Sequence, residues 1–265
     1  ILFRSLDQNA VAVVNYDDPY GKEFIAVSPV TPKTFGHKDG ADYRGRDVAI
    51  TPQGTAFILD CEGTSYQVQT PLLGDFNVYN VMNAIAVTRG LGVDMEDILE
   101  SMAQAPQVHG RFEKVKAEKG PTVVIDYAHS PDGLKNILTT ANEMKKGRVV
   151  LVFGCGGDRD QTKRPIMGKI GGSMSDFAYV TSDNPRTEDP ASIVAMVEEG
   201  VKESGGNYQV IVDRREAIKE AILHAKPEDM VVIAGKGHED YQILGTEKVH
   251  FDDFEEAKKA LALYE

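Results

Sequence analysis

Short apolar runs rich in β-branched residues alternate with longer amphipathic stretches from about residue 120 to the end of the chain. This alternation is typical of a parallel sheet whose strands are joined by helices. Right-handed crossovers between the strands then give a Rossmann-like, doubly wound, mostly parallel α/β fold. The predicted strands are Thr122–Asp126, Arg148–Phe153, Phe177–Thr181, Tyr208–Val212 and Met230–Ala234.

Two of the segments between these strands carry a helix start. Ser130 precedes Pro131 and Asp189 precedes Pro190, so each pair offers a capping oxygen followed by a proline at the first helical position. Apolar residues recur at helical spacing after both prolines. We therefore expect helices to begin near Pro131 and near Pro190.

The first part of the chain has a different pattern. Val11–Asn15 predicts a strand, and three later runs separated by turn residues predict an antiparallel meander. A helix over Phe76–Gly90 follows, and then a shorter helix that Asp94 caps and that ends near Gln104. Proline and glycine in 105–110 indicate a linker, which divides the chain into domains 1–109 and 110–265. The meander runs are Arg46–Thr51, Thr55–Asp60 and Thr64–Thr70.

The composition excludes several classes of protein. The 265 residues include 29 Lys and Arg against 41 Asp and Glu, and the formal charge of −12 has the wrong sign for nucleic-acid binding. Neither a membrane-spanning run nor a signal peptide is present, so we expect a cytoplasmic monomer that binds no membrane. Cys61 and Cys155 have no paired spacing and are expected to be reduced, buried thiols. The uncapped start at Ile1 resembles the tail of a helix and predicts that the chain is part of a longer protein.

Polar and glycine-rich segments follow four of the predicted parallel strands, and ligands bind at such strand ends in open parallel sheets. The loop after Phe177–Thr181 presents Arg186 on a turn that Pro185 stiffens. Because a guanidinium matches a carboxylate with two parallel hydrogen bonds, this loop predicts a small carboxylate ligand. The four segments are 126–132, 154–160, 183–189 and 235–240.

Structural explanations compete with the functional one at each loop. Asp126 and His129 suit a helix cap, and Arg186 could close a salt bridge to Glu188 or Asp189. Glycines 154, 156 and 157 fit a tight turn but neither a dinucleotide nor a phosphate loop. Arg159, Lys163 and Arg164 could form a solvated basic face, although cations at a helix start oppose its dipole. His238 and Glu239 lack the spacing of a zinc site. A purely structural interpretation would need an independent explanation for each of the four loops, and this coincidence favours a shared function.

Asn77, Asn80 and Asn83 recur every third residue near the start of the helix predicted over Phe76–Gly90. Such residues share roughly one helix face. Helix capping explains Asn77 but not the two deeper asparagines. An amide can both donate to and accept from a purine edge, so this face is a candidate contact for adenine.

Six segments in order along nearly the whole chain resemble the Mur ligases. Members of that family have a UDP-sugar domain, a central ATPase domain and a C-terminal domain that binds the incoming amino acid. The resemblance implies that ATP phosphorylates the side-chain carboxylate of D-glutamate in a UDP-N-acetylmuramoyl dipeptide, and that the amine of meso-diaminopimelate then attacks the acyl phosphate. The segments are Gly74–Ala86, His109–Glu113, Asp126–Asp132, Gly154–Pro165, Asp183–Asp189 and Gly235–Gln242.

The same resemblance assigns roles to individual residues. Arg186 would clamp the distal carboxylate of diaminopimelate, whereas Gly235 and Glu239 would take its distal ammonium. Since lysine lacks that carboxylate and would leave Arg186 unpaired, the resemblance favours diaminopimelate over lysine. Arg159 and Asn184 would complete the hydrogen bonds of the carboxylate, with Asp183 beside them. The residues expected on the ATP side are Asn80 near adenine, Arg111, Asp126 near the ribose, His129 and Lys163.

The chain also departs from the family. It contains no Gly-x-x-x-x-Gly-Lys-Ser/Thr phosphate loop, and the UDP-sugar domain is missing. The modified lysine that helps to hold Mg²⁺ in the family would lie just before Ile1. We therefore expect a partial, inactive central ATP-binding domain over 1–109, a complete amino-acid domain over 110–265, and no complete catalytic or metal site.

Four alternatives remain open at the level of the sequence. A lysine-adding Mur ligase and a folylpolyglutamate-type ligase would share the fold and the dependence on ATP. A nucleotide-dependent dehydrogenase fits the βα alternation, although the dinucleotide glycine spacing is absent. A noncatalytic, small-ligand-binding Rossmann-like module fits as well.

Overall fold

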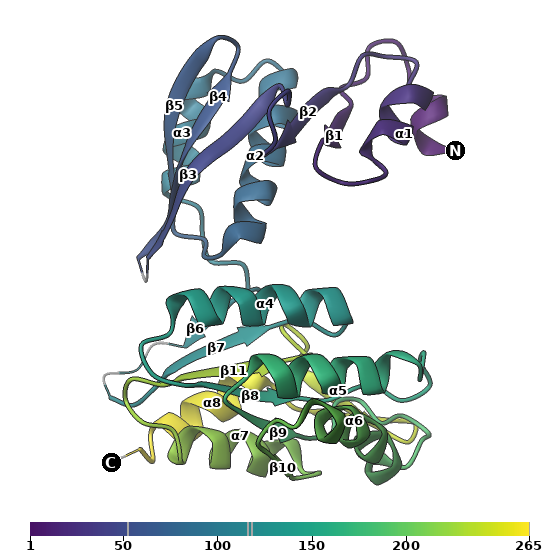
Figure 1. Cartoon of the computed structure of the whole chain (residues 1–265), viewed down its shortest axis with the longest axis vertical. Coiled ribbons are helices and arrows are strands. Elements are labelled where there is room, and N and C mark those ends of the chain that lie inside the picture. Colours follow the sequence, from purple (N-terminus) through teal and green to yellow (C-terminus); the bar gives the residue numbers. More distant parts are fainter. Residues whose placement is uncertain (52, 116, 118, 265) are drawn as a thin grey trace. The chain divides into compact units, whose positions relative to one another are not determined.

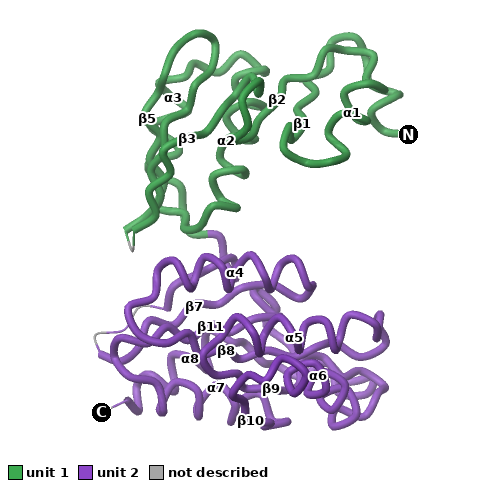
Figure 2. The backbone as a smooth tube through the Cα atoms, viewed as in Figure 1, with its two compact units in different colours: residues 1–107 green, residues 108–265 purple. Residues whose placement is uncertain are grey.

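The chain divides into two units, Ile1–Gln107 and Val108–Glu265, which are coloured separately in Figure 2. The structure is a computed structural model, and it describes residues 1–51, 53–115, 117 and 119–264. Each unit has its own sheet and its own buried core.

The second unit is built on a six-stranded sheet of order β10-β9-β8-β11-β7-β6 (Figure 1). All pairs in it are parallel except β6 with β7, which are antiparallel. The five strands expected from the sequence are confirmed, whereas the three-residue β6 is too short to show an alternating pattern. The strands are β6 Glu113–Val115, β7 Thr122–Asp126, β8 Val149–Phe153, β9 Phe177–Val180, β10 Tyr208–Val210 and β11 Met230–Ala234.

The helices cover both faces of this sheet. Ser130 Oγ accepts a hydrogen bond from the backbone of Gly133, and the Asp189 side chain accepts one from Ser192, so both expected caps are confirmed. Helices α4, α5 and α6 pack in a row on one face, and α7 and α8 pack on the other (Figure 1). The helices are α4 Pro131–Met144, α5 Lys163–Met174, α6 Pro190–Ser204, α7 Arg214–Leu223 and α8 Asp253–Leu261.

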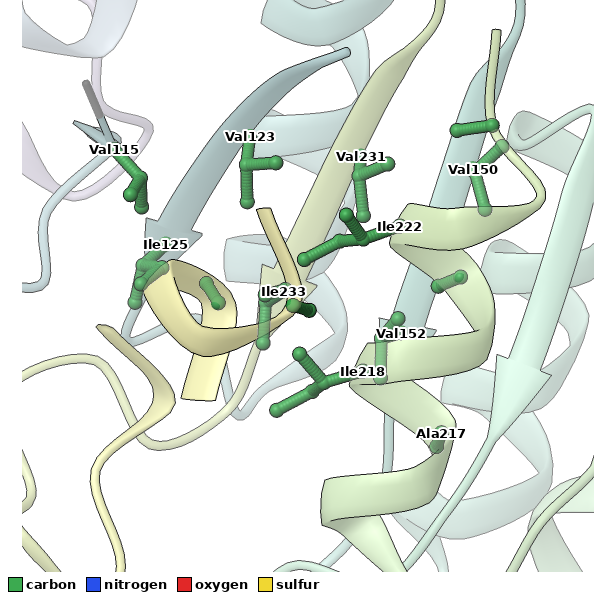
Figure 3. Packing of buried hydrophobic residues seen from close by; sticks show 14 of the residues in the cluster. Val115, Val123, Ile125, Val150, Val152, Ala217, Ile218, Ile222, Val231 and Ile233 are labelled. Atoms are coloured by element: carbon green, nitrogen blue, oxygen red, sulfur yellow. The ribbon is translucent and has the colours of Figure 1, made fainter. Parts of the chain in front are cut away.

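The core under α7 consists of alternate strand residues. Ile125, Val152 and Ile233 point to the same face, where Ile218 and Ile222 of α7 pack against the sheet (Figure 3). The intervening strand residues, such as Val124 and Leu151, are buried as well. Burial on both faces explains why these strands are continuous apolar runs in the sequence.

Strand β11 enters the sheet between β7 and β8, although it comes last of the parallel strands in the chain. The crossovers from β7 to β10 run in one direction across the sheet, and the return to β11 runs in the other. The loops after β7 and β8 therefore lead to helices on one face, while the chain after β11 continues to α8 on the opposite face. Such a switch point leaves room for a ligand at the strand ends.

The first unit contains a five-stranded sheet of order β1-β2-β3-β4-β5 (Figure 1). The antiparallel meander expected from the sequence is confirmed as β3-β4-β5, but β1, β2 and β3 are parallel and β2 was not predicted. The bounds are η1 Leu2–Ser5, β1 Val13–Asn15, α1 Gly21–Val27, β2 Lys33–Gly36, β3 Tyr43–Thr51, β4 Gly54–Cys61, β5 Thr64–Thr70, α2 Asp75–Gly90 and α3 Met95–Ala103.

The two helix caps expected in this unit are not formed by side-chain hydrogen bonds. Asp94 precedes α3, but its side chain accepts no hydrogen bond from that helix. Asn77 lies inside α2, and its amide donates to the carbonyl of Leu73 at 2.8 Å instead of capping backbone N–H groups. Asp94 is thus the N-cap of α3 by position alone, whereas Asn77 does not cap α2.

A buried ion pair joins the elements of the second unit. Arg214 of α7 donates to both carboxylate oxygens of Asp253 in α8 at 2.8 and 2.7 Å, and both side chains have no exposed surface. Its guanidinium also donates to the carbonyls of Ala234 and Ser182, at the ends of β11 and β9. One side chain thus fixes two helices and two strand ends.

Replacing Arg214 with Met is expected to lower the free energy of unfolding by about 3–5 kcal/mol, because Asp253 is left as an uncompensated buried charge. Urea denaturation followed by circular dichroism measures this change. Lys169→Met serves as the control, since Lys169 forms only an exposed pair with Glu203 and its loss should not move the urea midpoint. Equal midpoints for both variants would contradict the assigned role of Arg214.

Cys61 and Cys155 are free and buried, as the sequence predicts. Burial raises the pKa of the Cys61 thiol to about 11 and that of Cys155 to about 12. Near pH 8, roughly a thousandth or less of either thiol is then ionised, and the thiolate is the reactive form. We expect an aromatic disulfide reagent to label neither cysteine in the folded protein and both after denaturation. Fast labelling of the folded protein would contradict this prediction.

Candidate functional site

A pocket of about 440 Å³ lies where β7, β8, β9 and β11 end, entirely within the second unit. The loops that follow these four strands all contribute to it. Its location matches the switch point created by the insertion of β11. The pocket is lined by Tyr127, His129, Gly154, Gly156, Arg159, Asp160, Lys163, Asp183, Asn184, Arg186, Gly235, Glu239 and Tyr241.

The structure brings together most of the residues that the sequence singled out. All six residues assigned to the amino-acid ligand line the pocket, as do His129 and Lys163 from the ATP group. Asp126 and Arg111 belong to the same unit but are not part of this lining, and Asn80 lies on α2 of the first unit. The six residues are Arg159, Asp183, Asn184, Arg186, Gly235 and Glu239.

Arg186 is half-buried and has a strained backbone. Its φ is 53°, a left-handed conformation that residues other than glycine rarely adopt. Its Nη1 donates to the carbonyl of Gly157 at 2.9 Å and more weakly to that of Asn184 at 3.4 Å. Strained backbone of this kind is concentrated at functional sites.

The proposed salt bridge from Arg186 to Glu188 or Asp189 is not formed. Glu188 instead accepts hydrogen bonds from both terminal nitrogens of Arg164, at 2.7 and 2.9 Å, and Asp189 caps α6. Among the described residues, no carboxylate lies within ion-pair distance of Arg186. In the part of the chain that the structure describes, the guanidinium therefore borders the pocket with backbone carbonyls as its hydrogen-bond partners.

The pair of Arg164 and Glu188 holds two pocket loops together. Arg164 is fully buried at the start of α5, and Glu188 also accepts the backbone N–H of Asp158 at 2.6 Å. This partner supplies the negative charge that a cation at a helix start requires. A side chain at Gly157 would place its Cβ 1.9 Å from the carbonyl oxygen of Pro185, so this glycine permits the close approach of the two loops.

A second network fixes Glu239 at the other side of the pocket. Asn184 Nδ2 donates to Glu239 Oε2 at 2.8 Å, while Asn184 Oδ1 accepts from Lys236 Nζ at 3.2 Å and from the backbone of Ile243 at 3.0 Å. Two donors on Oδ1 fix the orientation of the amide. Lys236, which has no exposed surface, also pairs with Glu239 at 3.3 Å. The carboxylate of Glu239 is therefore held in one place, and its negative charge raises the pKa of Tyr241.

Four of the residues expected on the ATP side belong to the second unit, where His129 and Lys163 line the pocket and Arg111 and Asp126 do not. Lys163 Nζ donates to the carbonyl of His129 at 2.7 Å, and the guanidinium of Arg111 lies 4.9 Å from the centre of the Tyr127 ring. Asp126 is buried, and its carboxylate accepts hydrogen bonds from the backbone N–H groups of Phe112 and Ala128. Burial raises the pKa of Asp126 even though these two hydrogen bonds favour its ionised form.

Asn80 lies on the exposed side of α2. Its amide donates to Asn77 Oδ1 at 3.0 Å, and Asn83 is exposed one turn further on. The three asparagines thus include one buried residue and two exposed ones. Among the described residues, no group of three His, Cys, Asp or Glu side chains could hold a metal ion. No helix in the described part of the chain is long and apolar enough to cross a membrane.

Five residues of the pocket lining, and Lys236 beside it, were not assigned to the site from the sequence. Tyr127 and Tyr241 lie within segments that the sequence did single out, and the loop after β8 contributes Gly154, Gly156 and Asp160. Lys236 does not line the pocket but fixes two residues that do. Its position between two glycines after a buried strand was the only available signal, since its burial depends on the fold.

Comparisons with known proteins match both units of the chain to domains of one family. The family model described as Mur ligase middle domain matches residues 1–88, and the model described as Mur ligase, glutamate ligase domain matches residues 110–237. The UDP-N-acetylmuramoyl-L-alanyl-D-glutamate--2,6-diaminopimelate ligase of Syntrophomonas wolfei is 44% identical over 94% of this chain and 51% of that protein. The enzyme of the same name from Bacillus cereus is 46% identical over 94% of this chain and 50% of its own length.

A solved structure is similar as well. A structure titled as a UDP-N-acetylmuramoyl-L-alanyl-D-glutamate--2,6-diaminopimelate ligase has a TM-score of 0.65 and 37% identity, and the match covers 96% of this chain and 53% of that one. This chain therefore spans about half the length of the curated relatives it matches.

Gly235→Ala is expected to lower stability by an amount on the order of 1–3 kcal/mol. The φ of Gly235 is 123°, and an added Cβ would lie 2.6 Å from Asp183 Oδ2, so the carboxylate would have to move. Gly245→Ala is the matched control, because Gly245 also has a positive φ, 63°, but has nothing within 4 Å of the added atom. Urea midpoints compare the two variants, and an equal or smaller loss for Gly235→Ala would contradict the close packing at the pocket.

Proposed function

This chain belongs to the Mur ligase family, and we propose that it carries the acceptor site of an ATP-dependent ligase that joins meso-diaminopimelate to UDP-N-acetylmuramoyl-L-alanyl-D-glutamate. The observation that supports this most is that one pocket presents two opposite charges to a ligand. Arg186 offers a guanidinium without a carboxylate partner among the described residues, and Glu239 offers a fixed carboxylate. A zwitterionic amino-acid group satisfies both.

Diaminopimelate carries such a group at each end, and the distal one would remain in the pocket. Arg186 and Arg159 would bind the distal carboxylate, while Glu239 and the carbonyl of Gly235 would bind the distal ammonium. Only one N–H of the Asn184 amide has a partner among the described residues, so its other N–H is available to the carboxylate. The proximal amine is then left to attack the activated substrate.

Lysine is a poor substitute in this pocket for a physical reason. It has an ammonium at the distal position but no carboxylate there, so Arg186 would stay partly desolvated without an anionic partner. Sites built to hydrogen-bond a group of the ligand reject analogues that lack it more strongly than apolar pockets reject a missing methylene. The same reasoning disfavours a lysine-adding relative.

ATP would supply the phosphoryl group that activates the D-glutamate carboxylate. Lys163 and His129 line the same pocket and suit the negative charge of the reacting group, whereas Arg111 and Asp126 of the same unit suit the nucleotide. The new amide bond forms when the amine nitrogen of diaminopimelate attacks the activated carbonyl and phosphate leaves. The described residues contain no group of three His, Cys, Asp or Glu side chains that could hold a metal ion, so they offer no such group to Mg²⁺.

Arg186→Ala is expected to weaken the binding of meso-diaminopimelate to this chain about tenfold to a hundredfold, because a charge-assisted pair is lost. Lysine binding should stay nearly unchanged. Isothermal titration calorimetry measures both ligands, and Arg4→Ala is the control because Arg4 is exposed in the first unit. Equal binding of lysine and diaminopimelate by the unmodified chain would defeat the proposed specificity.

A further inference from the structure

The chain forms a small antiparallel hairpin, β12 Tyr241–Leu244 and β13 Glu247–His250, directly after the last pocket loop. All four residues of β13 are exposed, so the hairpin is not part of the core. Nevertheless it is attached to the loop that carries Arg186. None of the residues proposed to bind diaminopimelate or ATP lies in this hairpin.

Four hydrogen bonds connect β12 and its turn to residues 183–186. The backbone N–H of Arg186 donates to the carbonyl of Ile243 at 3.0 Å, and the backbone N–H of Gly245 donates to the carbonyl of Arg186 at 2.8 Å. Gln242 Nε2 donates to the carbonyl of Asp183 at 2.6 Å, and the backbone N–H of Ile243 donates to Asn184 Oδ1 at 3.0 Å. The arginine loop is thus paired with β12 almost like an additional strand.

These bonds act on the backbone conformation that aims the guanidinium. Both backbone polar groups of Arg186 are bonded to the hairpin, and its φ of 53° is unfavourable for a residue with a Cβ. Without those partners, the loop would relax toward ordinary backbone angles and the guanidinium would leave its position. The hairpin therefore holds the strain that presents Arg186 to the pocket.

We propose that Gln242 is a positioning residue that sets acceptor selectivity through Arg186, an inference that rests on the function proposed above. Gln242 does not line the pocket, and it is half-buried beside the loop. Its side-chain amide holds the carbonyl of Asp183, three residues before Arg186, while the hairpin backbone holds Arg186 itself. The loop is fixed at both ends by one short strand.

The test compares the affinity ratio of meso-diaminopimelate to lysine in Gln242→Met and in the unmodified chain. Methionine keeps the length of the side chain but removes the donor to Asp183. We expect the ratio to fall about threefold to tenfold, the range for one lost hydrogen bond, with lysine affinity nearly constant. Gln209→Met is the control, since Gln209 is an exposed strand residue of the same unit outside the pocket lining.

The same measurement in an Arg186→Ala background separates positioning from a general structural effect. If Gln242 acts through Arg186, Gln242→Met has no further effect on the ratio once Arg186 is gone. An equal loss in both backgrounds, or a parallel loss for both ligands, would overturn the inference. An unmodified chain that does not prefer diaminopimelate would instead overturn the proposed function, whereas a preference that Gln242→Met leaves intact would overturn only the role of Gln242.

Discussion

The position of β11 between β7 and β8 decides where the chemistry of the second unit can gather. Because β11 pairs in parallel with β7 on one side and with β8 on the other, the loops that follow these three strands all begin at the same edge of the sheet. The loops on either side lead to one face of the sheet, and the chain after β11 leads to the other. The pocket occupies the space that this divergence leaves, and β9 adds the loop that carries Arg186.

Two ion pairs outside the pocket lining keep that arrangement in place. The pair of Arg214 and Asp253 fixes the ends of β9 and β11. The pair of Arg164 and Glu188 joins the loops after β8 and β9. Both arginines are fully buried, so each depends on its carboxylate partner. By contrast, Arg186 has no such partner among the described residues, and its proposed role in binding a carboxylate rests on this difference.

Much of this organisation could be predicted from the sequence. The strands after residue 120 are buried on both faces and therefore appear as apolar runs, and the caps at Ser130 and Asp189 are local hydrogen bonds that neighbouring residues determine. Short elements were missed: β6 and β2 have three and four residues, too few for a periodic pattern. Asn77 was assigned to the wrong partner because the direction in which its amide points depends on the path of the chain before α2.

The sequence by itself determined the order of the longer strands and helices, the resemblance to the Mur ligases, and the residues at the strand ends that carry charge. Only the tertiary structure decided which of those ends meet, because strand order depends on pairing between segments far apart in the chain. It also decided that Glu188 forms its ion pair with Arg164 and that Lys236 is buried against Asn184 and Glu239. The backbone bonds between β12 and Arg186, which has a left-handed conformation, likewise exist only in the folded chain. These contacts join residues that no local pattern relates, so only the folded chain could reveal them.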